Sequence, residues 1–226
     1  MTLQSAAVEG RPAGARSTET APAIEARGLR RDFGDRTGLG GVSFSLLPGE
    51  GMAVIGPNGS GKSTLLRILA GLLRPSGGEV RVLGCALPKE TYRLRGRVGY
   101  LGHDPLLYRD LTARENLALA GALHRMDPAD AAARIDSLLE SVRMANRAGD
   151  RIAELSAGMR QRIDICRALL HDPDLLLMDE PDAHLDPEAR QLVAPLIAAG
   201  GDRTRVLVSH DREVATAGAD IVLELR

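Results

Sequence analysis

One stretch decides the fold of this chain: Gly56-Pro57-Asn58-Gly59-Ser60-Gly61-Lys62-Ser63-Thr64. It fits a pattern of glycine, four free positions and then Gly-Lys-Ser/Thr, which is typical of loops that bind phosphate. Backbone N–H groups close on phosphate oxygens only where no side chain stands in the way, and the glycines meet that condition. We expect Lys62 to meet the β- and γ-phosphates of ATP and the Ser63 hydroxyl to ligate Mg²⁺.

The segments on either side of this loop have the periodicity that such a loop requires. Residues 51–55 form an apolar run of strand length, and leucine and isoleucine recur at helical spacing after Thr64. A helix beginning near Gly61 would direct its free N–H groups and the positive end of its dipole at the phosphates. The plain alternative is a Gly/Ser turn that contains a lysine by chance, and the strand and helix flanks favour the nucleotide site.

Length and composition limit the remaining choices. A chain of 226 residues, 44% of them hydrophobic, can bury one core with an inserted subdomain. The formal charge is −1 and the arginines are scattered between acids, which predicts no nucleic-acid partner. Cys85 and Cys166 form no Cys-x-x-Cys pair, which indicates buried thiols in a reducing compartment.

The N-terminal residues and the order of elements complete the predicted layout. Residues 1–23 are polar and lack the hydrophobic centre of a signal peptide, so we expect a disordered tail. Two antiparallel strands are predicted between Ile24 and Leu46, and helices between residues 103 and 170. The predicted fold class is α/β, with a P-loop NTPase core (24–102 and 171–226), an antiparallel β subdomain and an inserted helical subdomain (103–170).

A second acidic segment supplies what a phosphate loop lacks. The apolar run Leu175–Met178 has the character of a buried strand and ends in Asp179 and Glu180. We expect Asp179 to bind Mg²⁺ and Glu180 to orient the water that attacks the γ-phosphate. A solvated acidic turn is the alternative, and the presence of the phosphate loop weakens it.

From about Ile24 to its end, the chain resembles the nucleotide-binding subunit of an ATP-binding cassette (ABC) transporter. The marker is Leu155-Ser156-Ala157-Gly158-Met159, which resembles the family signature Leu-Ser-Gly-Gly-Gln. Ser156 suits an N-cap and Gly158 leaves backbone N–H groups bare, so the helix start can bind a second anion. The resemblance implies a head-to-tail dimer with itself or a homologous ATPase, in which Ser156 reaches the ATP held by the other subunit. An ordinary N-cap is the alternative.

The same resemblance implies roles for isolated residues. His210 matches the histidine that contacts the γ-phosphate, and Asp186 matches a loop through which subunits communicate, although His184 departs from the usual small residue there. Phe33 matches the aromatic ring that stacks on adenine, with core packing as the alternative. His103 stands where the family has a glutamine near Mg²⁺ and water, and Asp104 is a second candidate for that role.

The loop after His103 narrows the resemblance. Its sequence is Gly-His-x-Pro at residues 102–105, and Leu-Thr-Ala-Arg-Glu-Asn-Leu follows at 111–117. This sequence is similar to that of the ATPase of the haem exporters of cytochrome c maturation. Drug and lipid exporter ATPases share much of it. The resemblance implies membrane-spanning permease subunits on separate chains and a cytoplasmic protein peripheral on the inner face of the membrane. Leu106, Leu107 and Tyr108 are candidate docking residues, with helix packing as the alternative.

Two functions of other classes compete with a transporter ATPase. A cassette ATPase acting in DNA repair or on ribosomes would carry long coiled coils or two cassettes, and neither is evident here. A small-molecule kinase would leave the signature, Glu180 and His210 as coincidences. The sequence therefore favours a transporter ATPase over both.

Overall fold

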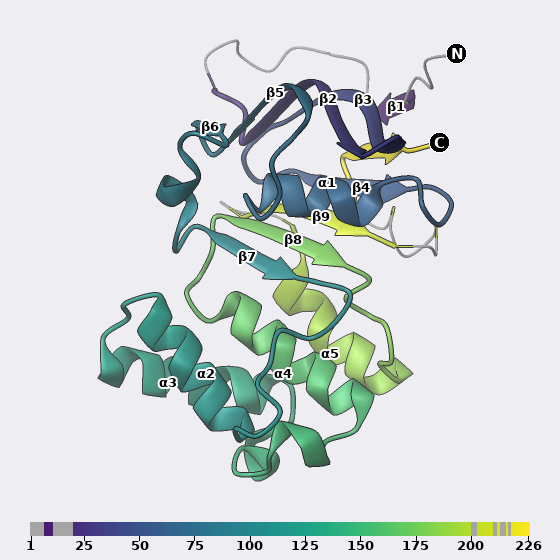
Figure 1. Cartoon of the computed structure of the whole chain (residues 1–226). Helices are drawn as coiled ribbons and strands as arrows, with labels where there is room; N and C mark the ends of the chain where they lie inside the picture. Colours follow the sequence, from purple (N-terminus) through teal and green to yellow (C-terminus); the bar gives the residue numbers. More distant parts are fainter. Residues whose placement is uncertain (1–6, 11–19, 200–202, 210–211, 213–215, 217) are drawn as a thin grey trace.

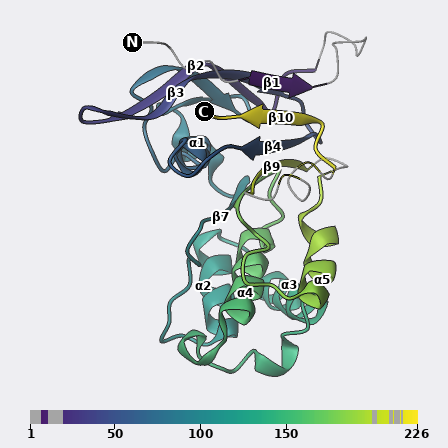
Figure 2. The same cartoon turned by 90° about the vertical axis from the view of Figure 1, so that its right-hand side faces the viewer.

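The fold is described from a computed structural model, which covers residues 7–10, 20–199, 203–209, 212, 216 and 218–226. Two sheets lie in one lobe and most of the helices in the other (Figure 1). A view turned by 90° shows the helical lobe extending away from the sheets (Figure 2). Across the described part of the chain, no helix combines the length and the apolar character that crossing a bilayer requires.

The larger sheet has six strands in the order β1-β10-β4-β9-β8-β7. Five of them run parallel to one another, and three of these, β4, β8 and β9, are buried at every residue. Burial on both faces explains the apolar runs at residues 51–55, 175–178 and 206–208. The parallel strands are β4 (Gly51–Ile55), β7 (Val98–Leu101), β8 (Leu175–Asp179), β9 (Thr204–Val208) and β10 (Ile221–Glu224).

The N-terminal tail differs from its prediction at Ala7–Gly10 and at Ala23, which is buried and accepts from the Leu83 N–H at 2.7 Å. Residues Ala7–Gly10 form strand β1, which pairs antiparallel with β10 at the edge of the larger sheet. The expectation of disorder over residues 1–23 is therefore wrong for these four residues and for Ala23. An edge strand presents a row of unpaired backbone N–H and C=O groups, and any short extended segment that reaches it can pair with them whatever its side chains.

The smaller sheet is antiparallel, with the order β3-β2-β5-β6. The predicted pair of antiparallel strands is confirmed, with Ile24 opposite Leu46 and Phe33 opposite Arg36. Helix α1 (Lys62–Leu69) lies between the two sheets and contributes four buried aliphatic side chains to one core with both of them (Figure 1). The strands are β2 (Ile24–Phe33), β3 (Arg36–Leu46), β5 (Gly77–Val82) and β6 (Cys85–Leu87).

The helical lobe contains α2 (Ala113–Leu123), α3 (Pro128–Ser141) and α4 (Ala157–Leu169), with α5 (Pro187–Ile197) beside them. Three short 3₁₀ helices connect the elements: η1 (Thr91–Leu94), η2 (Ala145–Arg147) and η3 (Ile152–Glu154). A capping box opens α2, because Thr112 accepts from the Glu115 N–H and the Glu115 carboxylate accepts from the Thr112 N–H.

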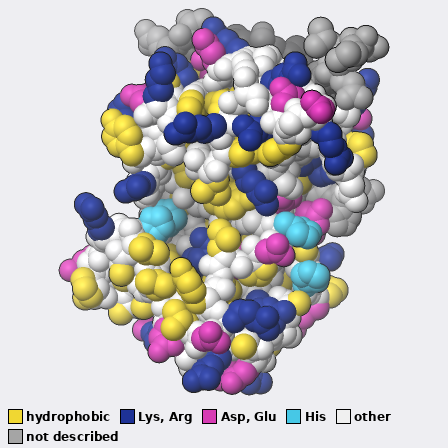
Figure 3. Space-filling view, in the orientation of Figure 1, with side chains coloured by type: hydrophobic (Ala, Val, Ile, Leu, Met, Phe, Trp, Pro, Cys, Tyr) yellow, Lys and Arg dark blue, Asp and Glu magenta, His cyan; other side chains and the backbone are white. Residues whose placement is uncertain are grey.

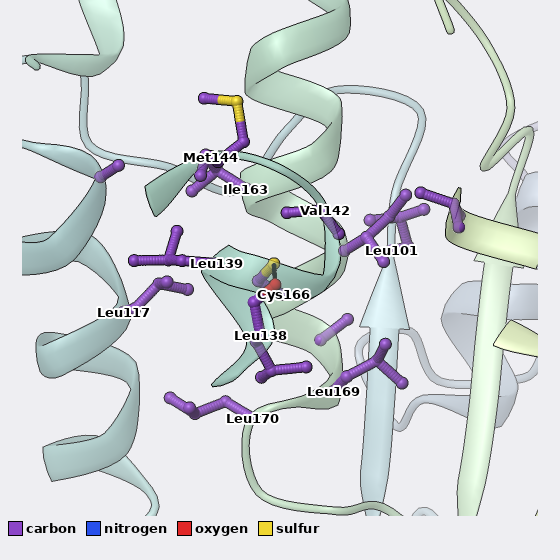
Figure 4. Close-up of a cluster of buried hydrophobic side chains, with 14 of the residues drawn as sticks. Leu101, Leu117, Leu138, Leu139, Val142, Met144, Ile163, Cys166, Leu169 and Leu170 are labelled. Carbon is purple, nitrogen blue, oxygen red and sulfur yellow. Dashed lines mark hydrogen bonds between the residues drawn. The ribbon is translucent and has the colours of Figure 1, made fainter. Parts of the chain in front are cut away.

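The helical lobe has its own core, which joins it to the edge strand β7. Side chains of α2, α3 and α4 meet there with Leu101 of β7 (Figure 4). Cys166 lies among them, and burial raises the pKa of its thiol to about 12. The thiol is therefore protonated and packs as a small apolar group, as its sequence context predicted.

Candidate nucleotide-binding site

A cleft of about 780 Å³ lies where the loop between β4 and α1 faces the carboxyl end of β8. It brings the two predicted halves of a nucleotide site together, although about 115 residues separate them in the sequence. It is lined by glycines and by polar or charged residues, which include both acids and the lysine: Gly38, Asn58, Gly59, Gly61, Lys62, Ser63, Thr64, His103, Asp179 and Glu180.

Two glycines of the loop cannot be replaced without a collision. Gly61 has φ +98°, and a Cβ atom there would strike the carbonyl oxygen of Gly38. Gly56 has φ +152°, and a Cβ atom there would strike the carbonyl oxygen of Leu225. The glycines thus let the loop lie tightly against the neighbouring backbone as well as leaving its N–H groups accessible.

The start of α1 fits an anion better than the start of any other described α-helix. Helices α2, α3, α4 and α5 each begin with a side-chain cap, whereas α1 has no side-chain cap and no acid in its first turn. The first N–H groups of a helix need acceptors, and phosphate oxygens supply them. The buried Ser60 hydroxyl beside it also has no hydrogen-bond partner among the described residues.

Lys62 is buried at the base of this loop. Its Nζ atom donates to the carbonyl oxygens of Gly56 and Pro57, at 2.8 and 2.9 Å. These bonds fix the ammonium group beside the free start of α1, so the positive charge and the helix dipole act on the same space. The residues present therefore fit a nucleotide phosphate chain.

The two acids follow one another at the end of β8 but differ in their surroundings. Asp179 is buried in the last position of the strand, and Glu180 is half-buried after it. Glu180 has φ +52°, and its N–H donates to the Val208 carbonyl oxygen of β9 at 2.9 Å. A residue other than glycine in the left-handed region of backbone conformation costs on the order of 1–3 kcal/mol. The sheet therefore holds Glu180 in a strained conformation at the cleft.

The predicted signature lies at the start of α4 and outside this cleft. Ser156 caps the helix as predicted, because its Oγ atom accepts from the Met159 N–H at 3.2 Å. A Cβ atom on Gly158 would lie 2.6 Å from the carbonyl oxygen of His184. The helix start thus packs against the loop that follows Glu180, and Ser156, Ala157 and Gly158 are not part of the cleft lining.

Gln161 makes a second link between α4 and the acidic loop, and sequence reasoning missed it. Its side chain is buried, and its Nε2 atom donates to the carbonyl oxygen of Pro181 at 3.0 Å. Pro181 directly follows Glu180. The signature helix therefore positions the backbone beside the predicted catalytic acid of its own chain.

Of two residues identified by resemblance, the structure places Asp186 and does not describe His210. Asp186 caps α5 through its Oδ1 atom, which accepts from the Ala189 N–H at 2.8 Å. This gives the residue a structural role, and communication between subunits stays a prediction. His210 lies outside the described residues.

Phe33 stands at the end of β2 with 48% of its surface exposed, so the alternative that it belongs to the core is wrong. The Arg31 guanidinium lies 4.8 Å from the centre of its ring. A Cβ atom on Gly38, which lines the cleft, would come within 2.5 Å of the Phe33 ring. The aromatic ring therefore packs against one residue of the cleft lining without being part of the lining, and stacking on adenine stays a prediction.

His103 lines the cleft from the loop after β7, whereas Asp104 is exposed and outside the lining.

Two buried polar side chains of the helical lobe hold the backbone of the loop that follows His103. Asp164 of α4 accepts from the Leu106 N–H at 3.2 Å. Asn116 of α2 accepts from the Tyr108 N–H at 2.7 Å and donates to the Tyr108 carbonyl oxygen at 3.0 Å. We call Asn116 and Asp164 the loop clamp.

The acidic member of the loop clamp is fully buried. Burial raises the pKa of Asp164, and the Arg167 guanidinium, whose Nε atom lies 2.6 Å away, acts in the opposite direction. Arg167 also donates to the carbonyl oxygen of Tyr100 at 2.6 Å. The pair ties α4 to both β7 and the loop.

The candidate docking residues divide between surface and core. Leu106 and Tyr108 are 51% and 64% exposed, whereas Leu107 packs against the core of the helical lobe. The helix-packing alternative therefore holds for Leu107 alone.

Comparison with known proteins agrees with this site. Residues 39–183 match the family model of the ABC transporter. The Nod factor export ATP-binding protein I of Paraburkholderia xenovorans (strain LB400) is 40% identical over 197 residues, covering 85% of this chain and 64% of that protein. That of Rhizobium meliloti (strain 1021) is 39% identical, covering 85% and 58%. The chain thus spans about three fifths of the length of these curated relatives.

Solved structures give the same answer. A dimeric post-hydrolysis structure of an ATP-binding cassette bound to ADP and Pi has a TM-score of 0.78 and 27% identity, covering 90% of this chain and 94% of that one. An ATP-binding subunit of an ABC transporter has a TM-score of 0.80 and 30% identity, covering 90% and 86%. The predicted α/β class with its P-loop core is confirmed, and the chain belongs to the ABC transporter family, as an ATP-binding subunit of the ABC ATPase type.

Proposed function

We propose that this chain hydrolyses ATP in the cleft between its phosphate loop and β8, and so powers an export transporter. The observation that carries the proposal is the convergence of Lys62, Ser63, Asp179 and Glu180 on one cleft. The loop and the uncapped start of α1 bind the phosphates, and Lys62 adds a positive charge beside them.

Each acid has a role that suits its surroundings. Ser63 and Asp179 are the residues that would hold Mg²⁺, which neutralises charge on the phosphates when it is bound. Glu180, half-buried and held by the sheet, orients the attacking water. His103 lines the same cleft and takes the place of the family glutamine beside that water.

The signature completes the site of a second subunit. Ser156, Ala157 and Gly158 do not line the cleft of their own chain, which supports an anion site directed at another copy. The similar ATP-binding cassette bound to ADP and Pi is a dimer. We infer a head-to-tail dimer, with itself or a homologous ATPase, in which ATP binding closes the pair and hydrolysis reopens it.

Export is the direction that the relatives favour, since both curated relatives named above act in Nod factor export. The partners would be permease subunits on separate chains, which hold this chain on the inner face of the membrane, and the exposed Leu106 and Tyr108 would dock against them. The narrower prediction of haem export and cytochrome c biogenesis rests on sequence resemblance, mainly at residues 102–105 and 111–117. Neither relative supports it, and the cargo stays open.

The decisive experiment uses Glu180→Gln, which keeps the size of the side chain and removes its charge. We expect the purified variant to lose at least about a hundredfold in ATP hydrolysis, because water is no longer oriented, and to accumulate as an ATP-bound dimer. Size-exclusion chromatography with ATP measures the dimer. Glu188→Gln, an exposed acid of α5, is the matched control and should behave as wild type.

Two results would count against the proposal. A Glu180→Gln protein that binds ATP and stays monomeric contradicts the shared site. Wild-type protein that consumes ATP only when a small-molecule acceptor is added identifies a kinase instead.

A further inference from the structure

Positive charge is concentrated in one segment of a chain whose total formal charge is only −1. Residues 62–97 contain eight Lys and Arg against two acids, Glu79 and Glu90, a net charge of +6. Residues 171–226 contain twelve acids against five Lys and Arg, a net charge of −7. The scattered charge seen along the sequence is therefore unequally divided between parts of the fold.

Most of this positive charge is on the surface. Lys62 is buried in the phosphate loop, and Arg97 pairs with Asp174, its Nε atom 2.8 Å from the carboxylate. The other six are exposed and form what we call the basic face: Arg67, Arg74, Arg81, Lys89, Arg93 and Arg95. Lys and Arg dominate the charged side chains over the lobe of the sheets (Figure 3).

Contacts between its elements make the basic face continuous. The turn after α1 lies against η1, because a Cβ atom on Gly71 would contact the side chain of Thr91. Strand β5 and η1 meet around Glu90, whose pKa is lowered by the Ala86 N–H, by the Arg93 guanidinium and by the nearby Arg81. The end of α1, β5, β6 and η1 are therefore neighbours in space.

Few acids compensate for this charge among the described residues. Glu90 accepts from the Ala86 N–H at 2.7 Å and from Arg93 at 2.8 Å, so its negative charge is paired with that of Arg93. Glu25, opposite Arg81 in the sheet, pairs with Arg27 at 2.6 Å. Only Glu79, exposed on β5, adds a negative charge within the segment.

Two large apolar side chains stand on the basic face. Leu72, in the turn after α1, is 63% exposed, and Tyr92 of η1 is 68% exposed. They lie on the two turns that touch, and neither lines the nucleotide cleft or the second, 410 Å³ cleft around Asp172 and Pro195. A protein helix that docks needs a groove, whereas a bilayer surface needs only cations with an amphipathic or apolar side chain between them.

We propose that the basic face binds the anionic surface of a lipid bilayer through the headgroup phosphates, with Tyr92 and Leu72 entering the interface. The inference rests on the proposed function, because a permease partner brings the chain to the membrane. Arginine suits phosphate oxygens through its forked donors, and five of the six cations are arginine. The contact adds a second attachment beside the permease and fixes which face of the ATPase meets the bilayer.

The test uses the full-length chain without any permease. Vesicles of equal parts phosphatidylcholine and phosphatidylglycerol are compared with pure phosphatidylcholine by co-sedimentation. We expect wild type to bind the anionic vesicles about tenfold more tightly or better, with binding lost at high salt. The triple variant Arg74→Gln, Arg81→Gln, Arg95→Gln should lose that preference.

Matched controls separate a specific face from net charge. The variant Arg109→Gln, Arg151→Gln, Arg190→Gln removes the same charge from exposed positions elsewhere and should bind as wild type. Tyr92→Ser tests the apolar contribution and should weaken binding by about threefold to tenfold. ATP hydrolysis by both triple variants should match wild type, which also shows that they are folded.

Several results would overturn the proposal. These are equal binding to both kinds of vesicle, equal loss in the two triple variants, and no binding of wild type at all. Displacement by inorganic phosphate at matched ionic strength would assign the face to a free phosphate ligand, and loss of permease co-purification without vesicle binding would assign it to a protein. Failure of ATP hydrolysis with intact vesicle binding would contradict the proposed function and leave this inference standing.

Discussion

In the sheet lobe, Lys62 and Ser63 are placed by the loop and helix that carry them, whereas in the helical lobe the functional loop is held by side chains from other elements. The Lys62 ammonium bonds to carbonyl oxygens five and six residues away. The Leu106 N–H bonds to a carboxylate 58 residues away. A site of the first kind depends on backbone shape, and one of the second kind depends on how the helices pack.

The largest expected effect breaks the long-range side of this comparison. Asp164→Ala removes the carboxylate and leaves the partly buried Arg167 without its ion partner, which should destabilise the fold by about 3 kcal/mol. Urea unfolding measures it. Asp164→Asn keeps an oxygen for the Leu106 N–H and should cost less. If both variants are as stable as wild type, the loop clamp does not hold the loop.

A smaller effect is expected from the local side. Gly61→Ala places a methyl group against the Gly38 carbonyl oxygen and requires a left-handed alanine, which together should cost about 2–3 kcal/mol and abolish ATP binding. Gly59→Ala is the matched control, because Gly59 also has a positive φ but nothing within 4 Å of an added Cβ. Binding of a fluorescent ATP analogue distinguishes them. Equal loss in both would show that backbone strain, and not close packing, limits the loop.

The smallest effect concerns a joint between the lobes. His124, at the end of α2, stacks on His171 with ring centres 3.7 Å apart, and His171 Nε2 lies 3.2 Å from the Val98 carbonyl oxygen of β7. Burial, followed by the nearby His124, lowers the pKa of His171 from 6.5 to about 4, and burial lowers that of His124. Arg167 opposes the charged form of both rings, and Asp172 favours that of His171.

The sign of the pH dependence follows from these shifts. Between the ordinary pKa of 6.5 and about 4, the unfolded chain binds protons at His171 that the folded chain does not. This part of the stability is complete above pH 6.5 and is lost as the pH falls toward 4. Urea midpoints across that range should fall less steeply for His171→Gln than for wild type. Identical slopes would show that the stacked pair carries no proton linkage.

Much of the fold was predictable from local patterns. So were two parts of the site, the phosphate loop and the strand that ends in Asp179 and Glu180. The cap at Ser156 is where the sequence placed it, because a cap depends on residues within three positions. The buried strands were recognisable from their apolar runs. Asn116 entered the sequence analysis only as part of the resemblance at residues 111–117. No local pattern predicts its hydrogen bonds to the backbone of Tyr108.

Other residues could not be predicted for the same physical reason. Gln161 and Asp164 are polar side chains on a helix, and a solvated face was the ordinary expectation for them. Their burial follows from the packing of α4 against β7 and the acidic loop. The strand at Ala7–Gly10 depends on pairing with the edge of the larger sheet at β10, and no pattern in the N-terminal residues predicts that pairing.

The sequence by itself determined the phosphate loop, the strand that ends in Asp179 and Glu180, and the capped start of α4, since each is specified by neighbours along the chain. Only the tertiary structure decided that the phosphate loop and the two acids meet at one cleft while the start of α4 lies outside it, and that Asp164 and Gln161 hold the loops beside the cleft. Such relations depend on distances between elements that are far apart in sequence, and the packing of the two lobes sets those distances.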